Sequence, residues 1–307
     1  MRPRAPMFSA RSRALGPGSR IAVIAPSSPF DRDLFDRGIA RLRSRYDVHA
    51  DPRVFETHGF HAGPDDVRLG VIHDALRDDS IVALVAARGG EGATRLLPGL
   101  DLDLVARARK LLVGFSDITA LHAAWRRAGV ASLHANVITS LGRGTDDDAR
   151  PWFDAVEGHP PAGWTDLESL SDERAAVTVE GPLVGGNLAV LAALAGTPHA
   201  LDAHGAIVCL EDVGERPYRI DRMLTTLLES RAFDGALGFV LGDFTGAEPG
   251  ADGVTARDVL TERLGALRVP VFAGAPMGHG ERNSPLPLGV RARLHTGSLE
   301  FLEACCG

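Results

Sequence analysis

This chain of 307 residues has few cysteines, no long apolar stretch and no excess of positive charge. Each of these features argues against a class of protein. The three cysteines, Cys209 and the adjacent pair Cys305 and Cys306, are too few for a disulfide framework, which predicts a reducing, cytoplasmic setting. No run of about 18 apolar residues occurs, so we expect neither a membrane-spanning helix nor a membrane partner. Acidic residues outnumber basic ones by 40 to 33, and the formal net charge of −7 argues against nucleic acid as a partner.

The remaining composition, 45% hydrophobic and 24% charged, is that of a globular protein long enough for two domains. In the first half, buried strands at 20–25, 81–87 and 110–114 alternate with helical patterns at 64–76 and 118–128. This alternation is typical of an α/β fold in which helices cover both faces of a parallel sheet.

The periodicity breaks down after residue 145, where three consecutive aspartates precede a segment rich in glycine and proline. Beyond this break the strands are shorter, beginning with one expected at 175–179, and two good helical patterns occur at 187–195 and 218–229. We therefore predict a smaller, mixed α/β second domain. The expected organisation is a loose N-terminal extension (1–19), a first domain (20–145), a linker (146–173) and a second domain (174–307).

A serine follows one of the predicted strands directly. The segment Lys110–Thr119 reads as a short apolar strand, a tight turn that contains Ser116, and the start of a helix. This arrangement lifts a hydroxyl above the edge of a sheet and resembles the nucleophile elbow of serine hydrolases, although Ile118 replaces the usual closing glycine. The alternative is that Ser116 or Asp117 only caps the helix.

A glycine-rich loop, Arg88-Gly-Gly-Glu-Gly92, follows the strand predicted at 81–87. Ligands of open parallel sheets bind outside the carboxyl ends of the strands, and glycines let backbone N–H groups approach an anion closely. Such groups could bind a phosphate or a developing oxyanion. The loop matches neither G-x-G-x-x-G nor the P-loop, so nucleotide binding is disfavoured, and a simple strand-ending turn is the alternative.

The second half offers an acid and a histidine. Glu211 comes directly after the apolar strand 206–210, which is hard to explain as a solvated position, whereas Glu215 and Arg219 can form an ordinary exposed helix pair. His279 lies between two glycines in a Gly/Pro-rich loop, which indicates access rather than core packing; an ordinary surface histidine is the alternative.

Ser116, Glu211 and His279 together indicate a catalytic triad more specifically than any one of them indicates catalysis alone. They occur in one of the chain orders known for catalytic triads. Serine needs a base, histidine can take and return a proton near neutral pH, and a carboxylate fixes the histidine tautomer. The histidines at 58 and 61 have no cysteine or paired carboxylate nearby to complete a tetrahedral set, so we predict no metal site.

These residues resemble the LD-carboxypeptidases, a family of serine peptidases that also contains the microcin C self-immunity peptidases. The resemblance runs from Ile21–Ser28 to Leu286–Gly289. Its marks are Ala87–Gly92, Gly114–Thr119, Gly185–Leu188, Leu210–Glu215, Tyr218–Arg222 and Gly278–Gly280.

The resemblance implies the same Ser–Glu–His triad and an oxyanion hole made by backbone N–H groups of Gly89, Gly90 and Asp117. It also implies a flavodoxin-like N-terminal domain that carries the serine and a C-terminal domain that carries the acid and the histidine. The active site would lie between the domains, in a homodimer, and would need no metal or organic cofactor.

The implied activity is removal of the terminal D-alanine from a murein tetrapeptide in peptidoglycan recycling, with Arg88 and Arg222 as candidates for holding substrate carboxylates. Two departures bear on the substrate. Glu91 stands where the family usually has an aromatic residue, and His134-Ala-Asn136 stands where it often has His-Gly-Pro. Glu91 and His134 are therefore further candidates for substrate contact. The alternatives are a microcin-C-like immunity peptidase that cleaves aminoacyl or peptidyl nucleotide analogues, and a non-catalytic protein that binds a ligand in its cleft.

Overall fold

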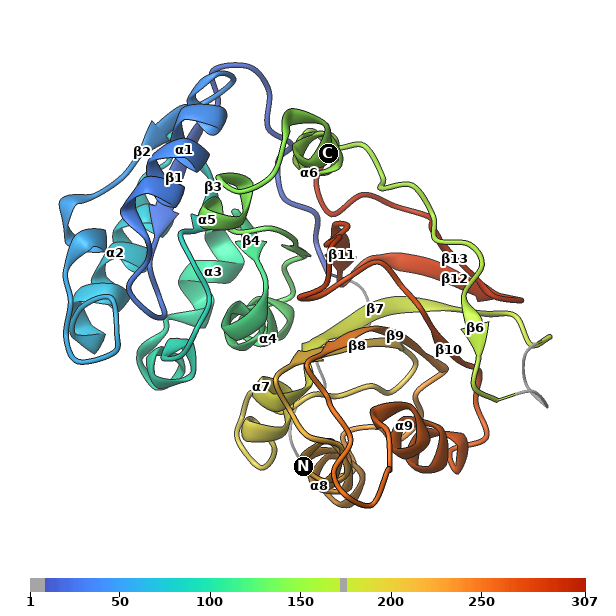
Figure 1. Ribbon diagram of the computed structural model, residues 1–307. Coiled ribbons are helices and arrows are strands. Elements are labelled where there is room, and N and C mark those ends of the chain that lie inside the picture. Colours follow the sequence, from blue (N-terminus) through green and yellow to red (C-terminus); the bar gives the residue numbers. More distant parts are fainter. Residues whose placement is uncertain (1–8, 172–175) are drawn as a thin grey trace. The chain divides into compact units, whose positions relative to one another are not determined.

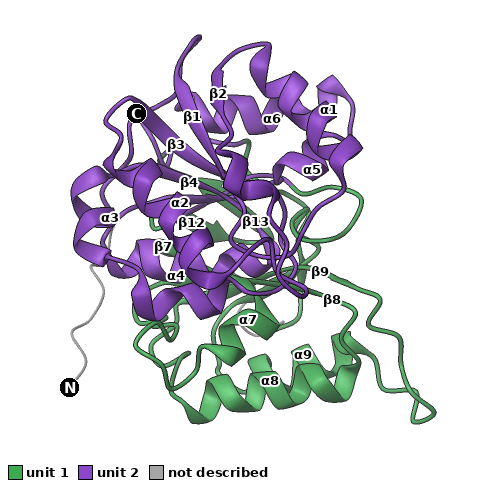
Figure 2. Ribbon diagram, turned by 90° about the vertical axis from the view of Figure 1, so that its left-hand side faces the viewer, with its two compact units in different colours: residues 1–8, 162–283, 289–303 green, residues 9–161, 284–288, 304–307 purple. Residues whose placement is uncertain are grey.

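The computed structural model describes residues 9–171 and 176–307, which form two compact units (Figures 1 and 2). Unit 2 consists of residues 9–161, 284–288 and 304–307, and unit 1 contains the described residues of 162–283 together with 289–303. None of the helices in these described stretches has the length and apolar character needed to cross a bilayer.

Unit 2 is built on a six-stranded sheet in the order β11-β5-β4-β3-β1-β2. The strands are β1 (Arg20–Ile24), β2 (Asp47–His49), β3 (Ile81–Ala86), β4 (Leu111–Gly114), β5 (Ser132–His134) and β11 (Leu286–Leu288). The first five strands are parallel, and β11 joins β5 in the antiparallel sense. The order β2-β1-β3-β4-β5 is that of flavodoxin-like folds, which confirms the expected fold class of this part.

The helices of unit 2 connect these strands (Figure 1). They are α1 (Arg32–Arg43), α2 (Asp65–Arg77), α3 (Leu102–Ala108), α4 (Thr119–Arg127), α5 (Ile138–Leu141) and α6 (Asp146–Val156), with short 3-10 turns η1 (Pro52–Phe55), η2 (Ala93–Gly99) and η3 (Ser116–Ile118). In α1, the Asp31 side chain accepts the Leu34 amide, and Phe35, Ile39 and Leu42 are buried. The helical spacing of these three apolar residues, four and then three apart, thus marks the face that packs on the core.

Two segments of unit 2 differ from the sequence-based expectation. Helix α6 occupies the start of the expected linker, because Thr145 and Asp148 form a capping box at its first turn and Trp152 of the same helix is buried. Residues 9–19 of the expected loose extension are packed: the Ser12 amide donates to the Cys305 carbonyl over 3.1 Å, and Leu15 is buried. Residues 1–8 lie outside the described part of the chain.

Unit 1 contains a seven-stranded mixed sheet in the order β13-β12-β7-β8-β9-β10-β6. The strands are β6 (Glu168–Ser169), β7 (Val179–Asn187), β8 (Ile207–Val213), β9 (Gly238–Thr245), β10 (Val271–Ala273), β12 (Arg291–His295) and β13 (Ser298–Phe301). Strands β7 to β10 are parallel, and the other three pair in the antiparallel sense. The strand expected at 175–179 instead begins at Val179; residue 175 is outside the described residues.

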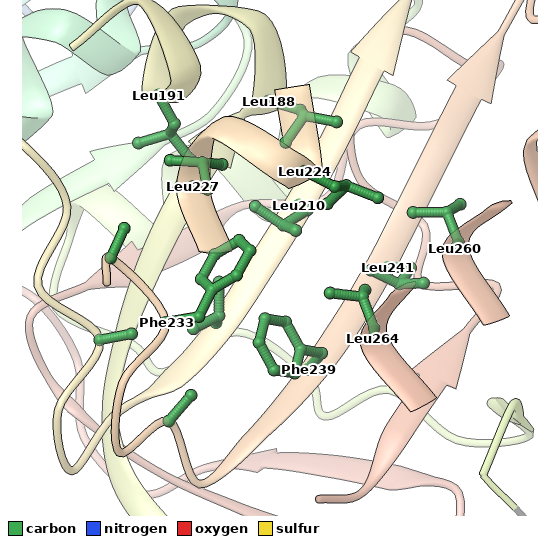
Figure 3. Close-up of a cluster of buried hydrophobic side chains, with 14 of the residues drawn as sticks. Leu188, Leu191, Leu210, Leu224, Leu227, Phe233, Phe239, Leu241, Leu260 and Leu264 are labelled. Atoms are coloured by element: carbon green, nitrogen blue, oxygen red, sulfur yellow. The ribbon is translucent and has the colours of Figure 1, made fainter. Parts of the chain in front are cut away.

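One face of this sheet is covered by α7 (Leu188–Ala193), α8 (Pro217–Glu229) and α9 (Ala256–Gly265), as Figure 1 shows. Figure 3 shows the resulting core, in which Leu224 of α8 and Leu264 of α9 face Leu210 and Phe239 of the sheet. Burying one leucine fully is worth about 1.5–3 kcal/mol, so this layer fixes the positions of β8 and β9. Strand β8 carries Glu211.

Candidate active site

Ser116 lies in a strained turn at the carboxyl end of β4. Its φ is 64°, in the left-handed region that non-glycine residues rarely adopt. A Cβ on Gly114 would come within 2.9 Å of Ile118, so the glycine lets the helix start pack tightly against the strand. Strand, turn and helix therefore form the predicted elbow, and Ile118 packs against it from the position of the usual closing glycine. The capping alternative is wrong, because the helix start has no side-chain cap from Ser116 or Asp117.

The Asp117 side chain joins three strand-end loops of unit 2. It is buried, and its Oδ2 accepts hydrogen bonds from the Ser27 hydroxyl at 2.6 Å and the Ala93 amide at 2.8 Å. Burial raises the pKa of this carboxyl group above its usual value, and the two hydrogen bonds oppose the rise. Sequence reasoning selected Asp117 for its backbone N–H and missed this role of its side chain.

The glycine-rich loop lies against the serine. A Cβ on Gly89 would stand 2.9 Å from the Ser116 Cβ and 3.1 Å from its Oγ. Gly90 has a φ of 112° and lies against Ser28, whose hydroxyl accepts the Glu91 amide over 3.1 Å. Four of the predicted site residues, Gly89, Gly90, Ser116 and Asp117, thus come together within unit 2.

The charged residues of the same loop have identifiable partners. The Arg88 guanidinium donates to the Pro29 carbonyl over 2.6 Å, which links the ends of β3 and β1. The Glu91 carboxylate lies 3.0 Å from the Nε2 of His61, which is buried, while the Glu91 side chain keeps 58% of its surface exposed. Glu91 therefore presents a carboxylate to solvent. It follows Gly89, the glycine that lies against Ser116, by two residues.

His61 and His58 exchange backbone hydrogen bonds of 2.9 and 3.1 Å, in which each amide donates to the other's carbonyl. Over residues 9–171 and 176–307, no group of three or more histidine, cysteine, aspartate or glutamate side chains could hold a metal ion.

Two further histidines support the end of β4. The buried His122 ring donates from Nε2 to the Gly114 carbonyl at 2.9 Å and accepts from the Ser132 hydroxyl at Nδ1, 2.8 Å away. Burial lowers the pKa of His122 to about 3, so the ring is neutral at physiological pH. His134, selected from the sequence as a substrate contact, is fully buried beside the Phe115 and His122 rings, and its surroundings are those of a core residue.

In unit 1, the buried Glu211 pairs with the partly exposed His279. The Glu211 Oε2 lies 2.7 Å from the His279 Nδ1; Glu211 has no exposed side-chain surface, whereas His279 keeps 18%. The sequence suggested that Glu211 lies just beyond the strand, whereas the structure places it inside β8. With Nδ1 donating to the carboxylate, Nε2 is the nitrogen that can accept a proton. This geometry suits a general base.

Asp212, next to Glu211, has a structural role that the sequence did not reveal. Its Oδ1 accepts from Asn187 Nδ2 at 3.0 Å and from the Val213 amide at 2.8 Å, and its Oδ2 accepts from the Ala189 amide at 3.0 Å. Burial raises the pKa of Asp212 to about 6, against the effect of these hydrogen bonds. Asp212 thus fixes the start of α7 against β8.

The start of α8 carries the remaining predicted residues. Glu215 and Arg219 lie 3.4 Å apart, which confirms the expected exposed pair. Arg222 is exposed, with its guanidinium 5.8 Å from the centre of the Tyr218 ring, itself 55% exposed. The neighbouring Asp221 pairs with Arg263 over 3.2 Å.

Comparison with known proteins identifies the family. Residues 21–135 match the LD-carboxypeptidase N-terminal domain, and residues 180–294 match the LD-carboxypeptidase C-terminal domain. A putative carboxypeptidase of Streptomyces coelicolor is 38% identical over 94% of this chain and 95% of its own length. The murein tetrapeptide carboxypeptidase of Pseudomonas aeruginosa is 34% identical over 92% of this chain and 95% of its own. The chain belongs to the LD-carboxypeptidase family, and it is a carboxypeptidase.

Solved structures agree with this assignment. The muramoyltetrapeptide carboxypeptidase of Oxalobacter formigenes is 33% identical, with a TM-score of 0.80 over 91% of this chain and 97% of that one. The MccF-like protein of Bacillus anthracis shares the fold at 23% identity, with a TM-score of 0.84 over 95% of this chain and 99% of that one.

Proposed function

We propose that the chain is a serine LD-carboxypeptidase that removes the terminal D-alanine from murein tetrapeptide, with Ser116, Glu211 and His279 as its catalytic triad. The observation that carries the proposal is the 2.7 Å contact between Glu211 and His279, which orients an imidazole as a general base. The left-handed turn at Ser116 and the names of the Pseudomonas and Oxalobacter relatives support it.

In this mechanism, the Ser116 Oγ attacks the carbonyl carbon that joins an L-configured diamino acid to D-alanine, and His279 Nε2 takes the hydroxyl proton. The C–N bond then breaks as His279 returns the proton to the departing amine, leaving an acyl-serine. Water, deprotonated by His279, releases the tripeptide. The negatively charged Glu211 stabilises the imidazolium formed in both steps.

The developing oxyanion needs donors aimed at it. We assign this role to backbone N–H groups of Gly89, Gly90 and Asp117, because Gly89 lies against the Ser116 side chain. Losing one such donor typically costs roughly 10²–10³ in rate. Arg88 and Arg222 are proposed to hold substrate carboxylates, and Glu91 to meet a cationic substrate group.

The direct test is incubation of the purified chain with murein tetrapeptide. The proposal expects a tripeptide and one equivalent of D-alanine. An unchanged tetrapeptide, at enzyme concentrations that hydrolyse other substrates, would exclude this substrate.

A second candidate is a microcin-C-like immunity peptidase. The Microcin C7 self immunity protein MccF, solved with aspartyl sulfamoyl adenosine, shares the fold at 21% identity and a TM-score of 0.86. The exposed Glu91 carboxylate favours this candidate, because it departs from the aromatic residue expected of the family. The two candidate functions are distinguished by measuring kcat/KM for aminoacyl sulfamoyl adenosine and for murein tetrapeptide in parallel. The substrate with the higher kcat/KM identifies the function.

The non-catalytic alternative is not retained, because the chain belongs to a family of enzymes. The homodimer, the cytoplasmic location and the place in peptidoglycan recycling stay predictions.

A further inference from the structure

The two glycines beside His279 each make room for a carboxylate of unit 1. A Cβ on Gly278 would stand 2.8 Å from Glu211 Oε2, and a Cβ on Gly280 would stand 2.0 Å from Asp243 Oδ2. Both contacts are shorter than a real Cβ makes, so a side chain at either position would force the carboxylate to move. The Gly-His-Gly sequence therefore allows two acidic side chains, rather than one, to approach the backbone that carries His279.

A β-bulge brings these two carboxylates to the same point. In the pairing of β8 with β9, Leu210 lies opposite Leu241 and Asp212 lies opposite Phe244, with a shift of register between them. Glu211 alone therefore faces two residues of β9, Gly242 and Asp243. Bulges bend a strand and re-aim its side chains, and they are common beside active sites.

The bulged end of β9 also holds the loop before and after His279. The Asp243 amide donates to the Met277 carbonyl over 2.9 Å, and the Ala275 amide donates to the Leu241 carbonyl over 3.0 Å. On the far side of the histidine, the Gly280 amide donates to the Asp243 carboxylate. Asp243 thus contacts the loop on both sides of His279. Its backbone amide bonds to Met277, before the histidine, and its side chain accepts from Gly280, after it.

The charges that face Asp243 are Glu211, His279 and Arg282. Burial raises the pKa of Asp243, as does the negative charge of Glu211, while the Gly280 amide, Arg282 and His279 lower it. Asp212, the neighbour of Glu211 in β8, is hydrogen-bonded to α7 and its N-cap residue instead. Besides Glu211 of β8, Asp243 of β9 is thus a second acidic group close to the loop that carries His279.

We propose that Asp243 is a positioning residue for His279, which it serves in two ways. It holds the histidine loop in place through the Gly280 amide, and its negative charge stabilises the protonated imidazole alongside Glu211. This inference rests on the proposed role of His279 as the general base. It explains why glycine follows the histidine, a feature that access alone would not require.

Two variants separate the two contributions. Asp243→Asn keeps an oxygen acceptor for Gly280 but removes the charge, and Asp243→Ala removes both. With Asn we expect the acid limb of the kcat/KM profile to move to lower pH by roughly one unit, because the imidazolium loses a favourable charge. With Ala we expect kcat to fall a further 10- to 100-fold, roughly, at nearly constant KM, because the base is displaced.

Gly280→Ala tests the same contact from the other side, since its Cβ would displace the Asp243 carboxylate; kcat should fall with Asp243 intact. Asp234→Asn is the matched control, because this exposed aspartate of unit 1 precedes the opposite end of β9. Its pH profile should equal that of the wild type. Thermal unfolding of every variant checks folding, and the Asn variant alone carries the test if the Ala variant does not fold.

A wild-type pH profile and kcat in both Asp243 variants would overturn the inference. This test does not depend on the substrate of the proposed function. A fluorophosphonate labels Ser116 without any peptide substrate, so the pH dependence of the labelling rate can be compared between the wild type and the Asp243 variants. If the wild type is labelled but releases no D-alanine, the substrate is wrong while the Asp243 test still stands.

Discussion

Glu211 and His279 lie 68 residues apart in the chain and 2.7 Å apart in space, and both belong to unit 1. Glu211 comes from the middle of β8, and His279 comes from the loop that follows β10. A fully buried carboxylate is costly unless it is hydrogen-bonded, and the His279 ring supplies a hydrogen bond to Glu211. Orienting the imidazole is the function that explains this placement.

Glu211→Gln should therefore impair catalysis while keeping the size of the side chain. An amide can donate its own hydrogen to Nδ1 and so favour the wrong tautomer, and we expect kcat to fall by roughly 10³–10⁴. D-alanine release from murein tetrapeptide measures the effect. Glu215→Gln serves as the control, because this exposed glutamate only pairs with Arg219. Equal losses in both variants would contradict the prediction.

Gly89→Ala should disable the serine without removing it. The new Cβ would stand 2.9 Å from the Ser116 Cβ, so either the serine or the loop must move. Because a displacement of about 1 Å in an active site can cost 10²-fold, we expect a loss of kcat of at least that order. Gly16→Ala, in the same unit with no atom within 4 Å of its new Cβ, should leave kcat unchanged. A fully active Gly89→Ala enzyme would remove the basis for the proposed oxyanion hole.

Glu91→Gln tests whether the exposed carboxylate selects a cationic substrate group. An exposed charge contributes little, so we expect kcat/KM to fall only about 2- to 5-fold for a tetrapeptide with lysine at the third position. The corresponding peptide with norleucine, which lacks the ammonium group, should be unaffected. A parallel decline for both peptides would mean that Glu91 acts on the fold of the loop and not on the substrate charge.

Acid should destabilise unit 2 through His122. The pKa of this ring is lowered to about 3 by burial, against 6.5 in the unfolded chain, so its contribution to stability is complete above pH 6.5. That contribution is lost as the pH falls from 6.5 towards 3, by at most about 1.4 kcal/mol per pH unit. Urea unfolding of wild type and His122→Gln across this range should show a shallower pH dependence in the variant. His159→Gln, at an exposed histidine of the same unit, should follow the wild type.

Local patterns revealed much of the fold and the main features of the site. The strand, turn and helix around Ser116 could be predicted because a short apolar run, a glycine and a helical period are all local in sequence. Helix α6 was missed because three aspartates were interpreted as a break, whereas they form the first turn of a helix that Thr145 caps. Acidic side chains are favourable there because of the helix dipole.

Long-range relationships could not be predicted from one sequence. The bond between Ser27 and Asp117 joins residues 90 positions apart, and no local pattern shows that these two side chains would pair. Asp243 lies beside Glu211 only because β9 carries one extra residue opposite β8. Such a bulge depends on the register between strands, which a single chain does not specify.

The most direct measurement is mass spectrometry of murein tetrapeptide after incubation with the wild type, Ser116→Ala and His279→Ala proteins in parallel. The proposed mechanism predicts loss of one D-alanine with the wild type alone, because the acyl-serine cannot form without the hydroxyl or its base. Equal loss of D-alanine with the wild type and Ser116→Ala would contradict the assignment of Ser116 as the nucleophile.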